Sequence, residues 1–76
     1  MYEVLKGILV DDLQVREEDI LPTATREEVG LDSLAALELA EVLNARFGIR
    51  IQDYELLDTT TLAEMAHLVA ERKERA

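Results

Sequence analysis

The stretch GLDSLAALELAEVL, residues 30–43, decides the fold because it contains the strongest helical signal in the chain. From Ser33 to Phe47 there is no glycine or proline, alanine and leucine dominate, and Gly48 follows as a typical C-terminal stop. At about 100° per residue, one arc of this helix carries the residues that we expect in the core: Ala36, Leu39, Ala40, Leu43 and Phe47. The sequence therefore predicts an amphipathic helix over 33–47.

The opposite arc of this helix is acidic and contains one large apolar residue. Leu34 lies there with Glu38 and Glu41, and Asp32 directly precedes the helix. A single exposed leucine is ordinary on a protein surface. A leucine surrounded by acids also fits a docking surface for another protein. Both interpretations stay open on the residues alone.

Ser33 could cap the helix or carry chemistry. The pair Asp-Ser ahead of an apolar periodic run is typical of a helix N-cap, so the sequence predicts that Ser33 caps. No Gly-x-Ser-x-Gly motif surrounds Ser33, and nothing marks His67 as a catalytic base. We expect His67 on the surface of the last helix and no hydrolytic activity.

Helices and a long loop flank the central segment. Residues 2–13 form a first amphipathic helix with four apolar residues at helical spacing: Leu5, Ile8, Leu9 and Leu13. Residues 14–31 contain Pro22 and Gly30 and predict a long loop, of a length that is often functional in a small domain. Apolar residues that could pin this loop to the core are Val15, Ile20, Leu21 and Val29.

The C-terminal third predicts a short helix and a long one. Asp53 could cap a brief helix, DYELL, at 53–57. Thr61 and Glu64 form a capping box for a last helix, which ends in the basic run ERKER at 71–75, favourable at a helix C-terminus. The fold class is all-α: one domain over 1–76, a small four-helix bundle of three longer helices and one short helix, with a long loop between the first two.

Composition excludes several functions. The formal net charge of −9 disfavours nucleic acid as a partner and favours basic protein surfaces. Cysteine is absent and His67 is the only histidine, which excludes disulfides and a Cys/His metal site. No segment has the roughly 18 apolar residues of a membrane span, and the first residues are a poor signal peptide because acids interrupt them. We expect a cytoplasmic monomer with no bound metal.

Four features together resemble the acyl carrier proteins: GLDSLAALEL at 30–39, the acidic helix that follows, the loop containing a proline, and TTTLAEMAHLV at 59–69. The resemblance extends from about Val4 to Val69. It implies a four-helix bundle whose serine, here Ser33, carries 4′-phosphopantetheine through a phosphodiester. That group would supply the thiol that a chain without cysteine lacks. The serine would be non-catalytic, and a phosphopantetheinyl transferase using coenzyme A and magnesium would load it.

The resemblance also implies binding partners and a type of carrier. Synthase or acyltransferase enzymes with basic docking patches would bind a main surface formed by Asp32, Leu34, Glu38 and Glu41. A second patch would contain Asp53, Glu55 and Asp58. The flanks GLDSL and AALEL look closer to polyketide-type carriers than to peptidyl carriers, which more often have two glycines before the aspartate.

This chain departs from the family pattern at several positions. Fatty-acid carriers often have an acid two residues after the serine, where this chain has Ala35. Asn44 and Arg46 stand where these carriers often have further acids, and Thr25 stands in the loop where a large apolar residue is usual. Three functions therefore remain to be compared: a polyketide or fatty-acid carrier, a peptidyl or aminoacyl carrier, and an acidic helical adaptor in which Ser33 only caps.

Overall fold

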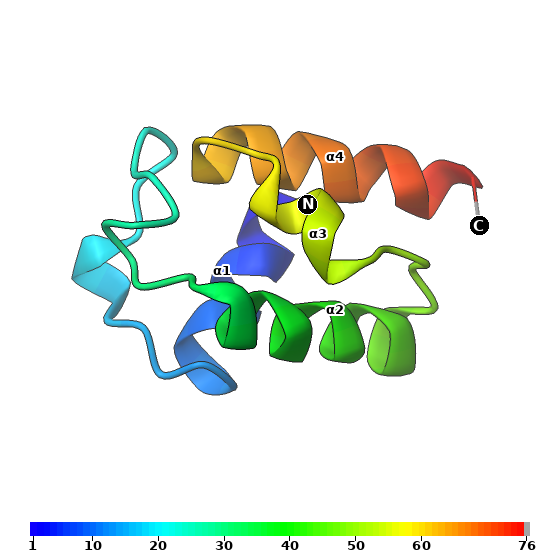
Figure 1. Ribbon diagram of the computed structural model, residues 1–76, viewed down its shortest axis with the longest axis horizontal. Coiled ribbons are helices and arrows are strands. Elements are labelled where there is room, and N and C mark those ends of the chain that lie inside the picture. Colours follow the sequence, from blue (N-terminus) through cyan, green and yellow to red (C-terminus); the bar gives the residue numbers. More distant parts are fainter. Residues whose placement is uncertain (76) are drawn as a thin grey trace.

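Three longer helices and one short helix build the part of the chain that the computed structural model describes, residues 1–75 (Figure 1). The longer helices are α1 (Tyr2–Asp11), α2 (Ser33–Phe47) and α4 (Leu62–Arg75), and the short one is α3 (Asp53–Leu57). A single 3-10 turn, η1 (Glu17–Asp19), interrupts the loop between α1 and α2. In Figure 1, α2 and α4 lie along opposite edges, α3 lies between them, and the long loop closes one end. The predicted all-α four-helix fold is confirmed.

The core is aliphatic and lies where the helices meet. Side chains that are almost completely buried come from every helix: Leu5, Leu9, Leu39, Leu43, Leu56, Leu62, Met65 and Val69. Within residues 1–75 no polar or charged side chain is buried. Charge is therefore left to the surface, where it is available to a partner.

The long loop is anchored mostly through its backbone. Thr25 pairs with Thr61 as an isolated bridge. The amides of Leu62 and Ala63 donate to the carbonyls of Ala24 (2.9 Å) and Pro22 (3.0 Å). These bonds satisfy N–H groups in the first turn of α4, because the first N–H groups of a helix have no partners within that helix. The loop therefore needs no large apolar residue at position 25 to hold its place.

Side chains add to this anchoring, but not all of the expected ones. Ile20 and Val29 are buried as predicted, Val15 is half-buried, and Ala24 and Leu31 are buried without having been predicted. The expectation for Leu21 is wrong, because its side chain is 56% exposed. Ile20 has an extended backbone, and successive side chains of an extended segment point in opposite directions. Burial of Ile20 thus turns Leu21 outward.

Two further expectations are wrong at helix ends. Phe47 is 42% exposed instead of buried. It is the last residue of α2, and the chain turns back at Gly48 (φ 65°) so that Ile49, which is fully buried, fills the core there. The first helix stops at Asp11, two residues before the predicted end, and leaves Leu13 half-buried.

Candidate functional site

The start of α2 presents Ser33 to solvent. Asp32 is the N-cap, and its Oδ1 accepts a hydrogen bond from the amide of Ala35 at 2.9 Å. Ser33 is the first residue with helical backbone and is exposed. The expectation that Ser33 caps is therefore wrong: the aspartate before it takes that role, since its carboxylate reaches the amide three residues on. The hydroxyl of Ser33 is left outside the capping arrangement.

Two amides of this first turn have no acceptor among residues 1–75. Ala35 donates to the side chain of Asp32, and Ala36 donates to its carbonyl at 2.9 Å. No hydrogen bond is formed by the amides of Ser33 and Leu34 in the described part of the chain. Free N–H groups and the helix dipole give this end of α2 a partial positive charge, which suits a phosphate ester.

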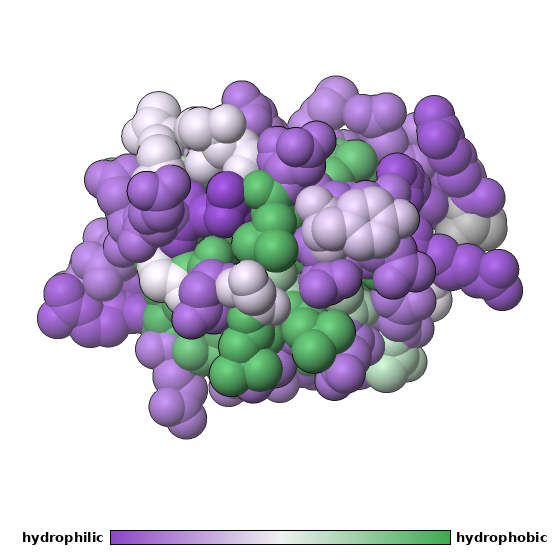
Figure 2. Space-filling model, in the orientation of Figure 1, coloured by the Kyte–Doolittle hydropathy of each residue, from purple (hydrophilic) through white to green (hydrophobic). Residues whose placement is uncertain are grey.

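The outward face of α2 combines apolar and acidic side chains. Leu34 is 65% exposed, which confirms its predicted orientation, and Glu38 and Glu41 are exposed near it. Leu37 is also exposed, at 45%, and was missed because it lies at the margin of the core stripe. Figure 2 shows apolar surface gathered on the face formed by α2 and α3, surrounded by polar side chains.

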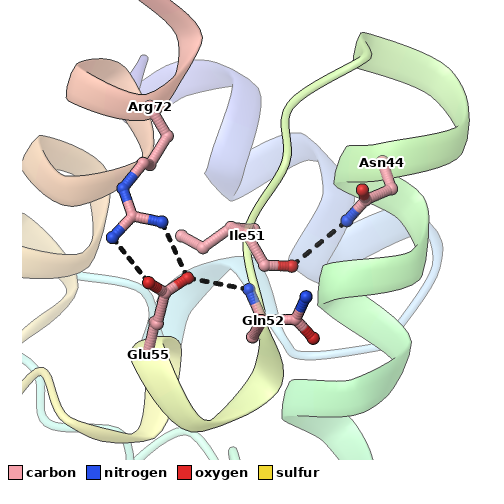
Figure 3. Close-up of polar contacts among 5 residues, drawn as sticks. All are labelled: Asn44, Ile51, Gln52, Glu55 and Arg72. Carbon is pink, nitrogen blue, oxygen red and sulfur yellow. Dashed lines mark hydrogen bonds and ion pairs between the residues drawn. The ribbon is translucent and has the colours of Figure 1, made fainter. Parts of the chain in front are cut away.

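The three acids predicted as a second patch on α3 have different environments. Asp53 is half-buried and Asp58 is exposed. Glu55 is bound internally: its Oε2 accepts from Nη1 of Arg72 at 2.8 Å and from the amide of Gln52 at 2.9 Å (Figure 3). The hydrogen bond from Arg72, then that from Gln52, holds the pKa of Glu55 below its ordinary value. Glu55 is thus less available to a partner than Asp58.

The same close-up shows how the connection between α2 and α3 is braced. Asn44 on α2 donates from Nδ2 to the carbonyl of Ile51 at 3.2 Å (Figure 3). Gln52, and not the expected Asp53, is the residue that precedes the first turn of α3 as its N-cap. Asn44 therefore has a structural role at a position where fatty-acid carriers often have an acid.

The described residues give little support for a catalytic histidine, a metal site or a membrane span. His67 is exposed on α4 and lies 3.1 Å from Glu71, one turn away, as expected of a surface residue. Residues 1–75 contain no group of three or more His, Cys, Asp or Glu side chains arranged to hold a metal ion. Across the same residues, each helix is too short or too polar to cross a membrane.

A family model described as a phosphopantetheine attachment site matches residues 3–69. The acyl carrier protein of Petrotoga mobilis is 30% identical over 73 residues, which cover 95% of this chain and 86% of that protein. The chain belongs to the acyl carrier protein family. Members of this family are carrier proteins or carrier domains, generally non-catalytic in themselves, and their cofactor is covalently bound 4′-phosphopantetheine. The predictions of the family and of its cofactor are confirmed.

Polyketide enzymes also contain segments similar to this carrier. The lovastatin diketide synthases of Aspergillus terreus and Monascus pilosus are each 33% identical over 72 residues. The match covers 95% of this chain but only 3% of either synthase. The family is therefore that of carriers for polyketide or fatty-acid synthesis, whereas the products of the two synthases are properties of those enzymes.

The start of α2 fits the prosthetic group of the family. An exposed hydroxyl, two amides without acceptors and a helix N-terminus lie together at Ser33 and Leu34. A phosphodiester formed at that hydroxyl would carry its negative charge at the positive end of α2. No cysteine competes as a thiol anywhere in the chain.

Proposed function

We propose that Ser33 is the residue that carries the 4′-phosphopantetheine and that the chain shuttles acyl intermediates of polyketide or fatty-acid synthesis. The observation that carries this proposal is the exposed Ser33 hydroxyl at the α2 N-terminus, beside two amides without acceptors. Ser33 is also the only serine in the chain. The long loop and Asp32 hold this end of the helix in place.

Attachment would need a separate enzyme. A phosphopantetheinyl transferase with magnesium would let Oγ of Ser33 attack the pyrophosphate of coenzyme A, with loss of the serine proton and release of adenosine 3′,5′-bisphosphate. The bound group then supplies a thiol that holds acyl groups as thioesters. The chain contributes an accessible hydroxyl, the amides of Ser33 and Leu34 near the phosphate, and an acidic surface for recognition.

Partner enzymes would bind the surface around that serine. We propose Asp32, Leu34, Glu38 and Glu41 as the main contacts for the transferase and for synthase or acyltransferase enzymes with basic docking patches. Leu34 would fill an apolar site and the acids would steer the encounter, because long-range attraction raises association rates. Asp53 and Asp58 remain candidates for a second patch, with Glu55 holding α3 in position.

The test is the intact mass of the protein after incubation with coenzyme A, magnesium and a broad-specificity phosphopantetheinyl transferase. The parent should gain one phosphopantetheine, and Ser33→Ala should gain none while circular dichroism shows an unchanged helical content. Thr23→Ala, which removes an exposed hydroxyl from the long loop, is the matched control and should be modified like the parent. A mass gain in Ser33→Ala, or none in the parent, would contradict the proposal and favour an adaptor without a prosthetic group.

A further inference from the structure

The last part of the long loop forms a single turn, here called the entry turn (residues 25–30), which leads into α2. The amide of Thr25 donates to Oε1 of Glu28 at 2.8 Å, and the amide of Glu28 donates to Oγ1 of Thr25 at 3.2 Å. This reciprocal pairing is that of a capping box. At the other end, the amide of Leu31 donates to the carbonyl of Arg26 at 2.8 Å, as where a helix terminates. The entry turn is therefore closed at both ends.

Arg26 fastens the entry turn to the connection between α3 and α4. Its side chain donates from Nε to the carbonyl of Thr59 at 2.7 Å, and its amide donates to the carbonyl of Thr60 at 3.3 Å. Its own carbonyl accepts from the amide of Leu31, two residues before Ser33. Arg26 thus joins the α3–α4 connection to the start of α2 through both its side chain and its backbone.

The guanidinium of Arg26 serves this contact and no ion pair. Among residues 1–75 it pairs with no carboxylate, although the chain has 17 acidic residues. The side chain is half-buried, and a charged donor forms a stronger hydrogen bond than a neutral one. Arg26 is therefore committed to a backbone carbonyl 33 positions away in the sequence.

The acceptor of this bond is itself fixed by the core. The amide and the hydroxyl of Thr59 both donate to the carbonyl of Leu56, at 3.2 and 2.7 Å. The side chain of Leu56 is fully buried. Hydrogen bonds therefore continue from the buried end of α3 through Thr59 and Arg26 to Leu31.

We propose that Arg26 is a positioning residue for the modification of Ser33. It acts through the entry turn, since no hydrogen bond joins its side chain to Ser33 in the described part of the chain. Placement of a reacting group matters because an error of about 1 Å can cost about a hundredfold in rate. The proposal rests on the proposed function in one respect, that Ser33 is the residue modified.

Two matched arginine substitutions in the long loop test this role. Arg26→Ala removes the side-chain bond to Thr59, and Arg16→Ala makes the same change of charge at an exposed residue that pairs locally with Asp19 at 3.1 Å. Kinetics are measured with the transferase, coenzyme A and magnesium at a temperature at which urea unfolding shows both variants to be folded. Arg26→Ala should lower kcat by about tenfold through misplacement of the serine. Its KM for the carrier should stay within about twofold of the parent, because the acids of α2 are unchanged.

Arg16→Ala should have the kcat and KM of the parent. Arg26→Lys keeps a charged donor on a long side chain, although without the planar guanidinium, and should recover about half of the lost kcat. Equal kcat for Arg26→Ala and Arg16→Ala, or a loss confined to KM, would overturn the proposal.

Amide hydrogen exchange judges the contact without the modification reaction. In ¹⁵N-labelled Arg26→Ala, exchange at Leu31 should be faster by about tenfold relative to exchange at Leu43 in the middle of α2, because the entry turn opens locally more often. Arg26→Lys should show a smaller change in the same direction, and it replaces the alanine variant if that one fails to fold. Unchanged exchange at Leu31 would overturn the proposal. A parent that is never modified, with exchange at Leu31 accelerated in the variant, would reject the proposed function and still support placement of the start of α2 by Arg26.

Discussion

Arg72 near the end of α4 and Glu55 of α3 form a two-point ion pair (Figure 3). Nη1 of Arg72 donates to Oε2 of Glu55 at 2.8 Å, and Nη2 lies 2.5 Å from Oε1. A helix of five residues is too short to persist alone. Burial of Leu56 in the core and this pair therefore hold α3 in place, and α3 packs mainly on α2.

The pair makes part of the stability depend on pH. The pKa of Glu55 is lowered in the folded protein. Ionised Glu55 therefore stabilises the fold fully at pH values above the ordinary pKa of a glutamate. That contribution is lost as the pH falls through the lowered value. Thermal melts from about pH 6 to about pH 3 should show that Glu55→Gln lowers Tm at the upper end and converges with the parent at the lower end. A constant difference across this range would contradict the assignment.

A double-mutant cycle at pH 7 provides the control for that experiment. Arg72→Gln should destabilise the protein in the same direction as Glu55→Gln, since each removes the two-point contact. The double variant should be less destabilised than the sum of the single variants, because residues in contact are not additive. Strict additivity in urea unfolding would mean that the pair contributes little.

Capping of α2 separates the roles of two adjacent residues. Asp32→Ala removes the side chain that accepts from Ala35 and should cost about 1 kcal/mol of the free energy of unfolding. Ser33→Ala removes an exposed hydroxyl outside the cap and should leave the stability within about 0.5 kcal/mol of the parent. Urea denaturation of both variants measures this. The reverse order of stability would restore Ser33 as the capping residue.

The strongly periodic parts of the chain were predictable from sequence, and the helix ends were less so. The arc through Leu39 and Leu43 identified the core face of α2 because residues at helical spacing share one side. Phe47 follows the same spacing but lies at the end of α2. The chain reverses at Gly48, so Ile49 occupies the core there in place of Phe47. Periodicity contains no information about where the neighbouring elements end.

In the candidate site too, some features could be predicted from the local sequence and others could not. Exposure of Leu34 followed from sequence, because an outward position on a helix depends only on local geometry. The ion pair between Glu55 and Arg72 joins residues 17 positions apart and depends on how the fold brings α3 and α4 together. The hollow lined by Leu13 and Val42 likewise needs Leu13, from the segment after α1, to lie beside α2. Such relations arise from tertiary packing and have no local signal.

Two leucines of α2 should respond differently to truncation. Leu39 is fully buried, and Leu39→Ala should cost about 3 kcal/mol through lost burial and a cavity. Leu34 is 65% exposed, so Leu34→Ala should cost less than about 0.5 kcal/mol yet slow modification by the transferase. Urea unfolding and modification kinetics measured on the same samples separate the two effects. Comparable destabilisation by both variants would contradict the outward position of Leu34.

Like charges should make the fold sensitive to salt. Asp and Glu number 17 against 8 Lys and Arg, and repulsion among the unpaired acids opposes the compact state. Because 0.1 M salt screens charges beyond roughly 10 Å, Tm should rise as sodium chloride is added at neutral pH. Glu41→Gln, which removes one unpaired acid, should reduce that rise slightly. A Tm independent of salt would show that the acids are too dispersed to repel one another.

Gln14, in the loop after α1, has a left-handed backbone with φ of 56°. This conformation is costly for a residue with a Cβ atom and is readily adopted by glycine. Gln14→Gly should therefore raise the free energy of unfolding by about 0.5 to 1 kcal/mol, the relief of strain outweighing the greater entropy of glycine in the unfolded chain. Gln14→Ala removes the same side chain and keeps the strain, so its stability should match that of the parent. If alanine stabilises as much as glycine in urea unfolding, the gain comes from losing the side chain and not from the backbone.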